Sequence, residues 1–274
     1  MSPPVLDIGV IYTGEDEHIQ NLLFSLRASL PQISFRLLLI DNHSDQGVER
    51  YAELIEPTDV LINSSRKTYA ENLNLILSAS TAEYVLLLNT DIQFDSENHC
   101  LDRMVTFMNQ HPDCGMSGCR VYLPGGAYGY SARRLQTSLT FLTRRLGLGV
   151  LFPREKERYL YMDRNRRSSF ACEWLSGCFL LVRRKAWEEV GGFDEQFRKY
   201  YEDVDYAVRM QQQNWKVMFH GDAFCIHNEQ RASRNLFSYD AWLHACSWYR
   251  WHRKWGWRPS RLLNEEETNQ ARAA

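Results

Sequence analysis

The first hundred residues alternate short apolar runs with longer amphipathic stretches. Apolar runs fall at Ile8–Tyr12, Arg36–Ile40, Val60–Ile62 and Tyr84–Leu88. Runs of this length without polar alternation indicate strands buried on both faces. Between them, apolar residues recur at helical spacing in stretches that begin near Ile19, Tyr69 and Leu101. The pattern predicts an α/β fold: a mixed, mostly parallel sheet flanked by helices.

The second half of the chain resumes ordered patterns at Trp174. It predicts strands at Cys178–Val182, Val217–Phe219 and Ala223–Ile226, and helices at Arg184–Val190, from Glu202, and at Phe237–Trp255. No linker rich in Pro, Gly or Ser divides the chain. We therefore expect one domain over residues 1–234, followed by an aromatic and basic helical segment over residues 235–274.

Residues 125–172 interrupt the alternation and are rich in arginine. Their composition is compatible with a solvated surface loop carrying a short helix, or with an acceptor-side flap that binds anions. Arg side chains bind phosphate through two parallel hydrogen bonds. For the region as a whole we expect phosphate contact.

Bulk composition narrows the class of protein. The chain has 274 residues and a formal charge of −2, which gives no global attraction to nucleic acid. Its seven cysteines form no CxxC pair, and no apolar run approaches the ~20 residues that span a bilayer. We expect a cytoplasmic protein. Its C-terminal tryptophans and basic residues favour either peripheral contact with the inner face of the cytoplasmic membrane or packing on the core.

Polar residues recur where the predicted strands end. Ligands of open α/β sheets bind beyond the carboxyl ends of the strands, although Asp and Asn also serve as turn residues there. The strand-end residues are Thr13, Glu15, Asp41, Asn42, Asn63 and Asp91.

Two acidic motifs could carry chemistry. Asp91, in Asn89-Thr90-Asp91, could bind a hard divalent cation through oxygen, or could simply cap a helix. Glu202, Asp203 and Asp205 lie at a predicted helix start, where acidic residues also complement the helix dipole. One of them in a cleft could act as a general base. His227 closes a strand and needs Asp91 nearby to act as a ligand.

Three stretches carry a resemblance to a known family. They are LIDNHS at Leu39–Ser44, LLLNTDI at Leu86–Ile92, and the long Trp174–Ser233 stretch with its VGGFDE, EDVD and strand-ending His. Together they make the chain similar to the family 2 glycosyltransferases of the GT-A fold, especially the bacterial rhamnosyltransferase-like branch. The resemblance covers nearly the whole chain.

The resemblance implies roles for individual residues. Asp91 and His227 would bind a divalent metal, Mg²⁺ or Mn²⁺, on the donor diphosphate. Asp203 would be the catalytic base, with Glu202 beside it, and the reaction would invert the anomeric centre. Donor contacts would come from Thr13, Glu15, Asp41, Asn42, Asn72 and Asn89. The acceptor and sugar site would involve Trp174, Ser176, Gly177, Arg133 and Arg134.

The chain departs from the family pattern in its nucleotide segments. Tyr12-Thr13-Gly14-Glu15 replaces Thr-Tyr-Asn, Asn63–Asn72 lacks the usual glycine, and Thr90 stands where the rhamnosyl branch commonly has Pro. These departures leave the donor base open between dTDP and UDP. The leading expectation is transfer of rhamnose from dTDP-rhamnose to a glycan or polyprenyl-diphosphate-linked acceptor in cell-surface polysaccharide biosynthesis.

Two other functions fit the same fold class: a non-catalytic binding protein and a nucleotidyltransferase. A protein of this fold could bind a nucleotide sugar or glycan without turnover, but the NTD and EDVD motifs argue against that. A nucleotidyltransferase would want a glycine-rich basic loop after the first strand, and Gly14–Glu17 is acidic instead.

Overall fold

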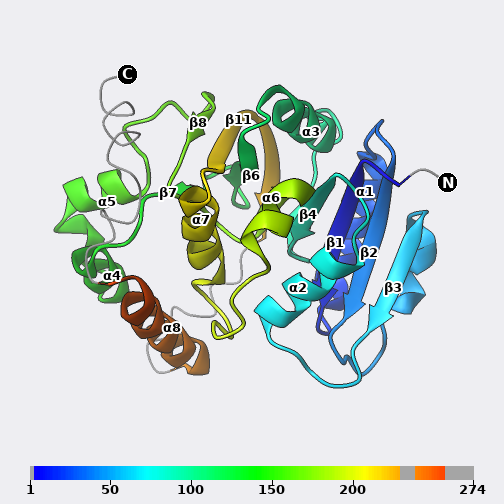
Figure 1. Ribbon diagram of the computed structural model, residues 1–274, viewed down its shortest axis with the longest axis horizontal. Helices are drawn as coiled ribbons and strands as arrows, with labels where there is room; N and C mark the ends of the chain where they lie inside the picture. Colours follow the sequence, from blue (N-terminus) through cyan, green and yellow to red (C-terminus); the bar gives the residue numbers. More distant parts are fainter. Residues whose placement is uncertain (1–2, 229–237, 257–274) are drawn as a thin grey trace.

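The computed structural model describes residues 3–228 and 238–256 and, within them, shows a twisted sheet covered by helices on both faces (Figure 1). The main sheet has nine strands, in the order β3-β2-β1-β4-β10-β6-β11-β5, with β8 paired to β11. Its strands are β1 (Leu6–Tyr12), β2 (Phe35–Asp41), β3 (Thr58–Ile62), β4 (Tyr84–Leu88), β5 (Ile92–Gln93), β6 (Cys114–Tyr122), β8 (Phe170–Ala171), β10 (Phe179–Arg183) and β11 (Lys216–His227). The strands β7 (Ala132–Arg133) and β9 (Trp174–Leu175) form a separate pair.

The sheet confirms the expected mixed, mostly parallel class. Strands β1, β2, β3 and β4 run parallel to one another, and β6 runs parallel to β11. Strand β10 runs antiparallel to both β4 and β6. Its first residue, Phe179, pairs with Leu88, the last residue of β4. The segment that enters β10 therefore lies at the carboxyl edge of the parallel strands.

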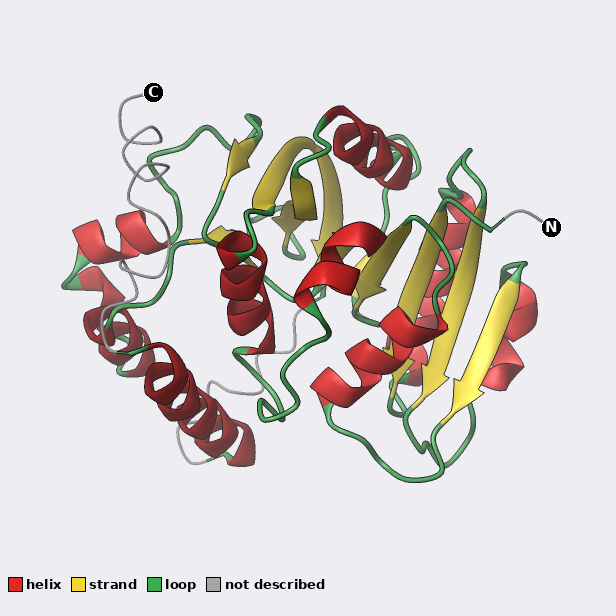
Figure 2. Cartoon of the chain, in the orientation of Figure 1, coloured by secondary structure: helices red, strands yellow, loops and turns green. Residues whose placement is uncertain are grey.

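Helices cover both faces of this sheet (Figure 2). They are α1 (Asp16–Ala28), α2 (Tyr69–Ala79), α3 (Cys100–Gln110), α4 (Ser138–Arg145), α5 (Pro153–Tyr159), α6 (Arg184–Val190), α7 (Glu202–Gln212) and α8 (Tyr239–Trp255), with 3₁₀ turns η1 (Glu49–Leu54) and η2 (Leu148–Val150). Alternate residues of each strand enter two cores. One core packs against α1 and α3, and the other against α2, α6, α7 and α8.

Strand β6 and the antiparallel direction of β10 were not expected from the pattern. Residues 217–226 form one strand with an irregularity between His220 and Phe224 rather than two strands. Residues 125–172 hold two helices and a 3₁₀ turn, which is more regular structure than the loop with one short helix that was one of the two alternatives.

Helix α8 packs onto the body of the protein through α7. Trp251 is buried, and Nε1 of Trp255 donates to Oδ1 of Asp205 at 2.7 Å. Nζ of Lys254 lies 2.8 Å from the same oxygen and 2.6 Å from Asp194. Packing on the core therefore engages much of this aromatic and basic segment. Residues 257–274 of the expected segment lie outside the described residues.

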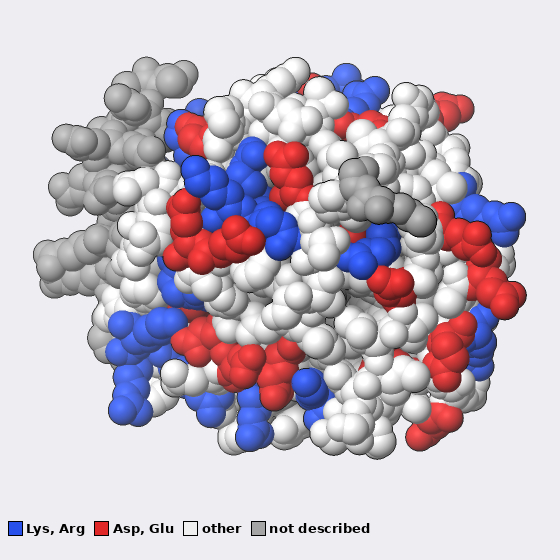
Figure 3. Space-filling model, turned by 45° about the vertical axis from the view of Figure 1, so that its right-hand side comes forward, with Lys and Arg blue, Asp and Glu red and all other residues white. Residues whose placement is uncertain are grey.

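Charged side chains are mixed over the face shown in Figure 3, where basic and acidic groups adjoin one another. Two arginines of residues 125–172 likewise pair with acidic side chains. Arg134 forms a bidentate pair with Asp163, and Arg158 pairs with Glu155. Arg134 and Arg158 therefore have internal partners, whereas Arg133 lines the pocket described below. No helix among the described residues has the length and apolar character needed to span a bilayer.

Candidate active site

Asp91 and His227 meet at the carboxyl edge of the sheet. Asp91 follows β4, and its carbonyl accepts from the backbone N–H of Asn228 at 2.8 Å. This backbone contact brings the last residue of β11 beside it, so that Nε2 of His227 lies 3.1 Å from Oδ1 of Asp91. Burial lowers the pKa of His227, but the neighbouring Cys178 and Asp91 outweigh burial and raise it to about 10.

The pair fits a divalent cation that is held largely by its substrate. Oδ1 of Asp91 is buried and accepts no aligned hydrogen bond. The described residues hold no cluster of three or more acidic, His or Cys side chains suited to a metal. Mg²⁺ and similar ions are commonly bound by one or two carboxylates together with substrate phosphates and water. Asp91 and His227 can supply the protein's share of such a site, with loss of the His227 proton on binding.

Asp203 is oriented by two backbone N–H groups. It lies in the first turn of α7, where Oδ1 accepts from Val204 N at 2.8 Å and Oδ2 accepts from Gly177 N at 2.9 Å. Burial raises the pKa of Asp203, although these N–H groups and Arg133 oppose the rise. A carboxyl with a raised pKa is a better proton acceptor near neutral pH. A Cβ added at Gly177 would lie 3.3 Å from Oδ2, so glycine permits this close approach.

Glu202 is the more deeply buried carboxyl of the pair. Its residue is 6% exposed, and Oε2 is buried without a hydrogen-bond partner. Burial, followed by the charge of Asp203, raises the pKa of Glu202 well above its ordinary value. At neutral pH, the two neighbouring carboxyls therefore favour keeping a proton on Glu202.

The hydroxyl of Tyr69 lies between the two acidic motifs. The sequence pattern predicts only that Tyr69 lies on a helix, so this contact was not expected. Its hydroxyl donates to Oδ1 of Asn89 at 2.8 Å and lies 3.4 Å from the carbonyl of Gly177. Burial raises the pKa of Tyr69 well above 10, and the carboxylates of Glu202, Asp203 and Asp91 raise it further. The Tyr69 hydroxyl therefore lies between the segment that carries Asp91 and the segment of Gly177, whose N–H binds Asp203.

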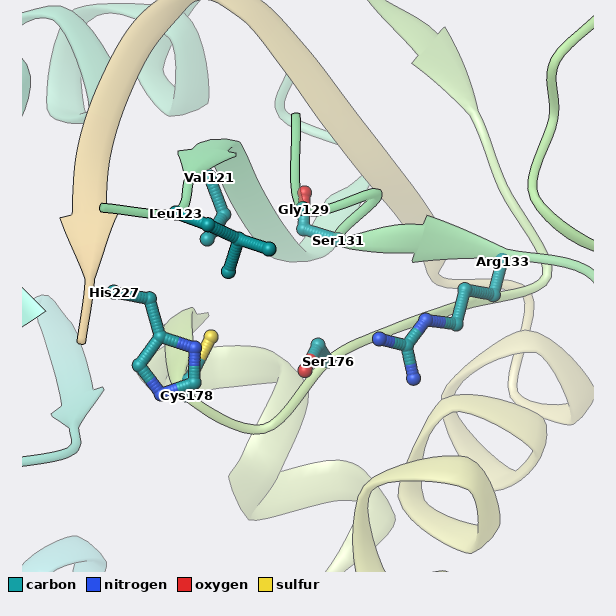
Figure 4. Close-up of a pocket in the computed structure, with 8 residues that line it drawn as sticks. All are labelled: Val121, Leu123, Gly129, Ser131, Arg133, Ser176, Cys178 and His227. Atoms are coloured by element: carbon teal, nitrogen blue, oxygen red, sulfur yellow. The ribbon is translucent and has the colours of Figure 1, made fainter. Parts of the chain in front are cut away.

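A pocket opens between these motifs and the flap (Figure 4). The empty space at this pocket, counted together with the solvent at its open side, is about 280 Å³. Its lining residues are Val121, Leu123, Gly129, Ser131, Arg133, Ser176, Cys178 and His227. Figure 4 shows Arg133 extending toward Ser176, with Cys178 beside His227. The pocket therefore joins the Asp91–His227 pair to the one flap arginine that reaches it. Cys178 was not singled out in the sequence because it reads there as a small apolar residue.

The acceptor-side residues separate into those at the pocket and those behind it. Arg133 lies over the Trp174 ring, 5.0 Å from its centroid, and Ser176 N donates to Ser131 O at 2.9 Å. Trp174 is buried and donates through Nε1 to Arg134 O at 2.8 Å. Arg134 itself faces Asp163 and the Tyr161 ring. The structure thus gives Trp174 and Arg134 supporting positions, with Arg133 and Ser176 at the pocket.

The expected donor residues are held in loops at the ends of β1 and β2. Oδ1 of Asp41 accepts from Ser44 N, and Oδ2 accepts from Ser44 Oγ and Val48 N. These bonds order the loop after β2 while leaving acceptor capacity on the carboxylate. Thr13 N donates to Oε2 of Glu15 at 2.8 Å, and the Thr13 hydroxyl bonds to the same carboxylate, which closes the turn after β1.

Three buried asparagines form a network below these loops. Asn63 Nδ2 donates to Oδ1 of both Asn42 and Asn72, at 3.0 and 2.7 Å. Asn72 is fully buried and donates to Thr68 O, and Asn42 bonds to both backbone groups of Lys67. The polar groups of Asn42 and Asn72 are paired internally, and these bonds hold the loops after β2 and β3 together; their donor contact stays a prediction.

The fold and the site together define a GT-A glycosyltransferase. A sequence model of glycosyl transferase family 2 matches residues 7–191. The chain belongs to this family. It is 28% identical over 242 residues to N-acetylglucosaminyl-diphospho-decaprenol L-rhamnosyltransferase of Mycobacterium tuberculosis, covering 84% of this chain and 78% of that protein. It is 21% identical over 256 residues to rhamnosyltransferase WbbL of Escherichia coli K12, covering 89% and 88%. These similarities place it in a rhamnosyltransferase-like branch.

Solved structures share the fold. The mannosyltransferase PcManGT of Pyrobaculum calidifontis, in complex with GDP-Man and Mn²⁺, aligns with a TM-score of 0.59 at 18% identity, over 88% of this chain and 60% of that one. GalNAc-T7 with UDP, GalNAc and Mn²⁺ aligns with a TM-score of 0.65 at 12% identity, over 92% and 48%. The chain therefore spans about half to three fifths of these two structures.

Proposed function

We propose that the protein is an inverting, metal-dependent glycosyltransferase that moves rhamnose from dTDP-rhamnose to a hydroxyl of a polyprenyl-diphosphate-linked glycan. The observation that carries the proposal is the position of the Tyr69 hydroxyl between the two acidic motifs. It donates to Asn89 of the Asp91 motif and contacts Gly177, whose N–H binds Asp203. The pocket lined by His227 and Arg133 is built on the same segment, which also carries Ser176 and Cys178. The similar rhamnosyltransferase of M. tuberculosis, named for a diphospho-decaprenol-linked acceptor, supports the choice of sugar and acceptor.

In the proposed reaction, Asp203 accepts the proton of the acceptor hydroxyl as its oxygen attacks the anomeric carbon. The bond from that carbon to the nucleotide diphosphate breaks, and the leaving oxygen takes the electron pair. One base is enough because no covalent intermediate forms. The N–H groups of Gly177 and Val204 hold the carboxylate in place before the attack.

Each other group has a defined part in this scheme. Asp91 and His227 would hold a divalent cation, which would supply positive charge to offset the charge of the leaving diphosphate. Arg133 supplies a fixed positive charge at the pocket, suited to a diphosphate of the acceptor or donor. The buried asparagine network holds the donor loops, and Asp41 retains acceptor capacity for the nucleoside.

The proposal is tested by a donor panel. Thermal melting with dTDP, UDP and GDP, each with and without Mn²⁺ or Mg²⁺, identifies the base, because tight ligand binding stabilises the native state. Transfer is then measured with dTDP-rhamnose, UDP-N-acetylglucosamine and a polyprenyl-diphosphate N-acetylglucosamine acceptor. Rhamnose transfer that requires the cation supports the proposal. Binding with neither transfer nor donor hydrolysis would instead favour a non-catalytic binding protein.

A further inference from the structure

Helix α4 has its polar and apolar faces reversed relative to an ordinary surface helix. Thr140 and Thr143 are buried, and their hydroxyls bond to Glu155 and to the carbonyl of Leu139. Leu139, Leu142 and Leu146, at spacings of three and four, are exposed. Residues at this spacing share one side of a helix, so the leucines form an outward stripe while the threonines face the protein.

The apolar surface continues through the turn that follows α4. Val150 is 89% exposed and Leu151 is 71% exposed, and the next residue, Phe152, is exposed as well. We call the six exposed apolar side chains on α4 and this turn the leucine face: Leu139, Leu142, Leu146, Val150, Leu151 and Phe152. Single exposed apolar residues are common on protein surfaces, but a contiguous group of them surrounded by polar residues marks an interaction surface.

Charge near the leucine face indicates what it contacts. Residues 138–158 contain five Lys or Arg and two Glu, in a chain whose formal charge is −2. Arg144, Arg154 and Lys156 are exposed beside the apolar side chains, whereas Glu155 is paired with Arg158. Aliphatic side chains with flanking cations complement the boundary between acyl chains and anionic headgroups.

The leucine face also lies close to the candidate active site. Gln136, just before α4, donates to Tyr159 of α5 and accepts from the hydroxyl of Tyr201, which directly precedes Glu202. Gln136 also lies three residues after Arg133, which is the last residue of strand β7. Helices α4 and α5 lie together at one end of the molecule in Figure 1.

We propose that the leucine face docks this protein on the surface of an anionic lipid bilayer. A second copy of the chain is the competing occupant. A standard protein interface takes roughly 20–30 residues a side, whereas this face offers six apolar ones with like charges around them. The inference does not rest on the transfer reaction, because docking is measured without donor or acceptor.

The test is flotation of the full chain with phosphatidylcholine vesicles, with and without phosphatidylglycerol. The wild type should float with the anionic vesicles and less so at high salt. The double variant Val150→Ser/Leu151→Ser should bind about tenfold more weakly, because two aliphatic side chains no longer enter the bilayer. The matched control is Phe24→Ser, which removes an exposed apolar side chain of α1.

Three results would overturn the proposal. They are wild-type protein that stays with the soluble fraction, a double variant that floats as well as wild type, and a Phe24→Ser variant that loses binding equally. If sedimentation equilibrium shows that the wild type is a dimer and the double variant a monomer, the leucine face binds a second copy of the chain instead. Thermal melting with dTDP checks that each variant is folded, and transfer to a water-soluble acceptor separates a docking defect from failure of the proposed function.

Discussion

Oδ2 of Asp203 accepts a hydrogen bond from the backbone N–H of Gly177 at 2.9 Å. The bond joins the start of α7 to the segment that enters β10, and it fixes the carboxylate beside the pocket residue Ser176. Asparagine at position 203 can accept the same hydrogen bond through its side-chain oxygen. This substitution therefore removes the base and keeps the bond from Gly177, while the N–H of Val204 loses its side-chain acceptor.

For Asp203→Asn we expect kcat to fall by about 10²–10⁴-fold, the usual contribution of a general base. Donor affinity, measured by calorimetry with the matching nucleotide and Mn²⁺, should stay at the wild-type value. Asp113→Asn, which alters a surface pair with Lys216, serves as the control and should retain full activity. Wild-type transfer by Asp203→Asn would rule out this residue as the base.

Removing the carboxylate at position 91 should act on the donor rather than on proton transfer. Asp91→Ala leaves His227 as the remaining side-chain ligand, so the concentration of Mn²⁺ needed for half-maximal donor binding should rise at least about tenfold. Calorimetric titration of the nucleotide at several Mn²⁺ concentrations measures this directly. Asp95→Ala, in the loop beyond β5 where its carboxylate accepts from Glu97 N, should leave the titration unchanged; equal effects from both variants would argue against a metal role.

The hydroxyl of Tyr69 should matter for the alignment of the two acidic motifs. Tyr69→Phe leaves Asn89 Oδ1 without its donor and should lower the free energy of unfolding by about 1 kcal/mol. Because the phenol contacts the segments that carry Asp91 and Gly177, we also expect a lower kcat with little change in KM and a shifted acid limb of the pH–rate profile. A variant with reduced stability but an unchanged pH profile would reduce Tyr69 to a structural residue.

Burial of Glu202 should make stability depend on pH. Its pKa is raised in the folded protein, so its contribution to stability is fully present below the unfolded pKa of about 4.3 and is lost as pH rises through the folded pKa. Glu202→Gln stays neutral and should be more stable than wild type by about 1 kcal/mol or more at pH 8, and not at pH 4. Urea unfolding at the two pH values measures the difference; a gap that widens toward low pH would contradict the raised pKa.

Asp205 should contribute to stability rather than to chemistry, although it belongs to the same acidic motif. It is fully buried and bonds to Arg209, Lys254 and Trp255. Asp205→Ala removes the hydrogen-bond partner of Trp255 Nε1 and one of the partners of Arg209 and Lys254, and should destabilise the protein by about 3 kcal/mol. Urea unfolding gives the cost, and donor binding at low temperature should survive. Loss of turnover with unchanged stability would place Asp205 in the catalytic machinery instead.

The sequence predicted the first four strands and their helices because each strand is a continuous apolar run bounded by polar residues. Strand β6 was missed because its segment, Cys114–Tyr122, mixes Gly, Ser and Cys with apolar residues and lacks either period. Periodicity also carries no information on strand direction, so the antiparallel course of β10 had to come from the structure.

The candidate site was predicted less evenly. Motifs pointed to Asp91, Asp203 and His227, and the structure brings Asp91 and His227 together and places all three near one pocket. Composition could not show that Arg134 pairs with Asp163, since pairing depends on side chains 29 positions apart. Donor contact by Asn72 stays a prediction; its internal hydrogen bonds could not be predicted, because they depend on loops that only the folded chain brings together.

The reversed direction of β10 has a practical consequence for engineering this enzyme. Most loops at the ligand-binding edge of such a sheet follow a strand, but Ser176 and Gly177 come before strand β10. A mutant library built only from segments downstream of strands would leave these two positions untouched. Randomising residues 174–178 together with 89–91 would sample the two segments that the Tyr69 hydroxyl contacts, and changes of acceptor preference should arise from the first set, which includes the pocket residues Ser176 and Cys178.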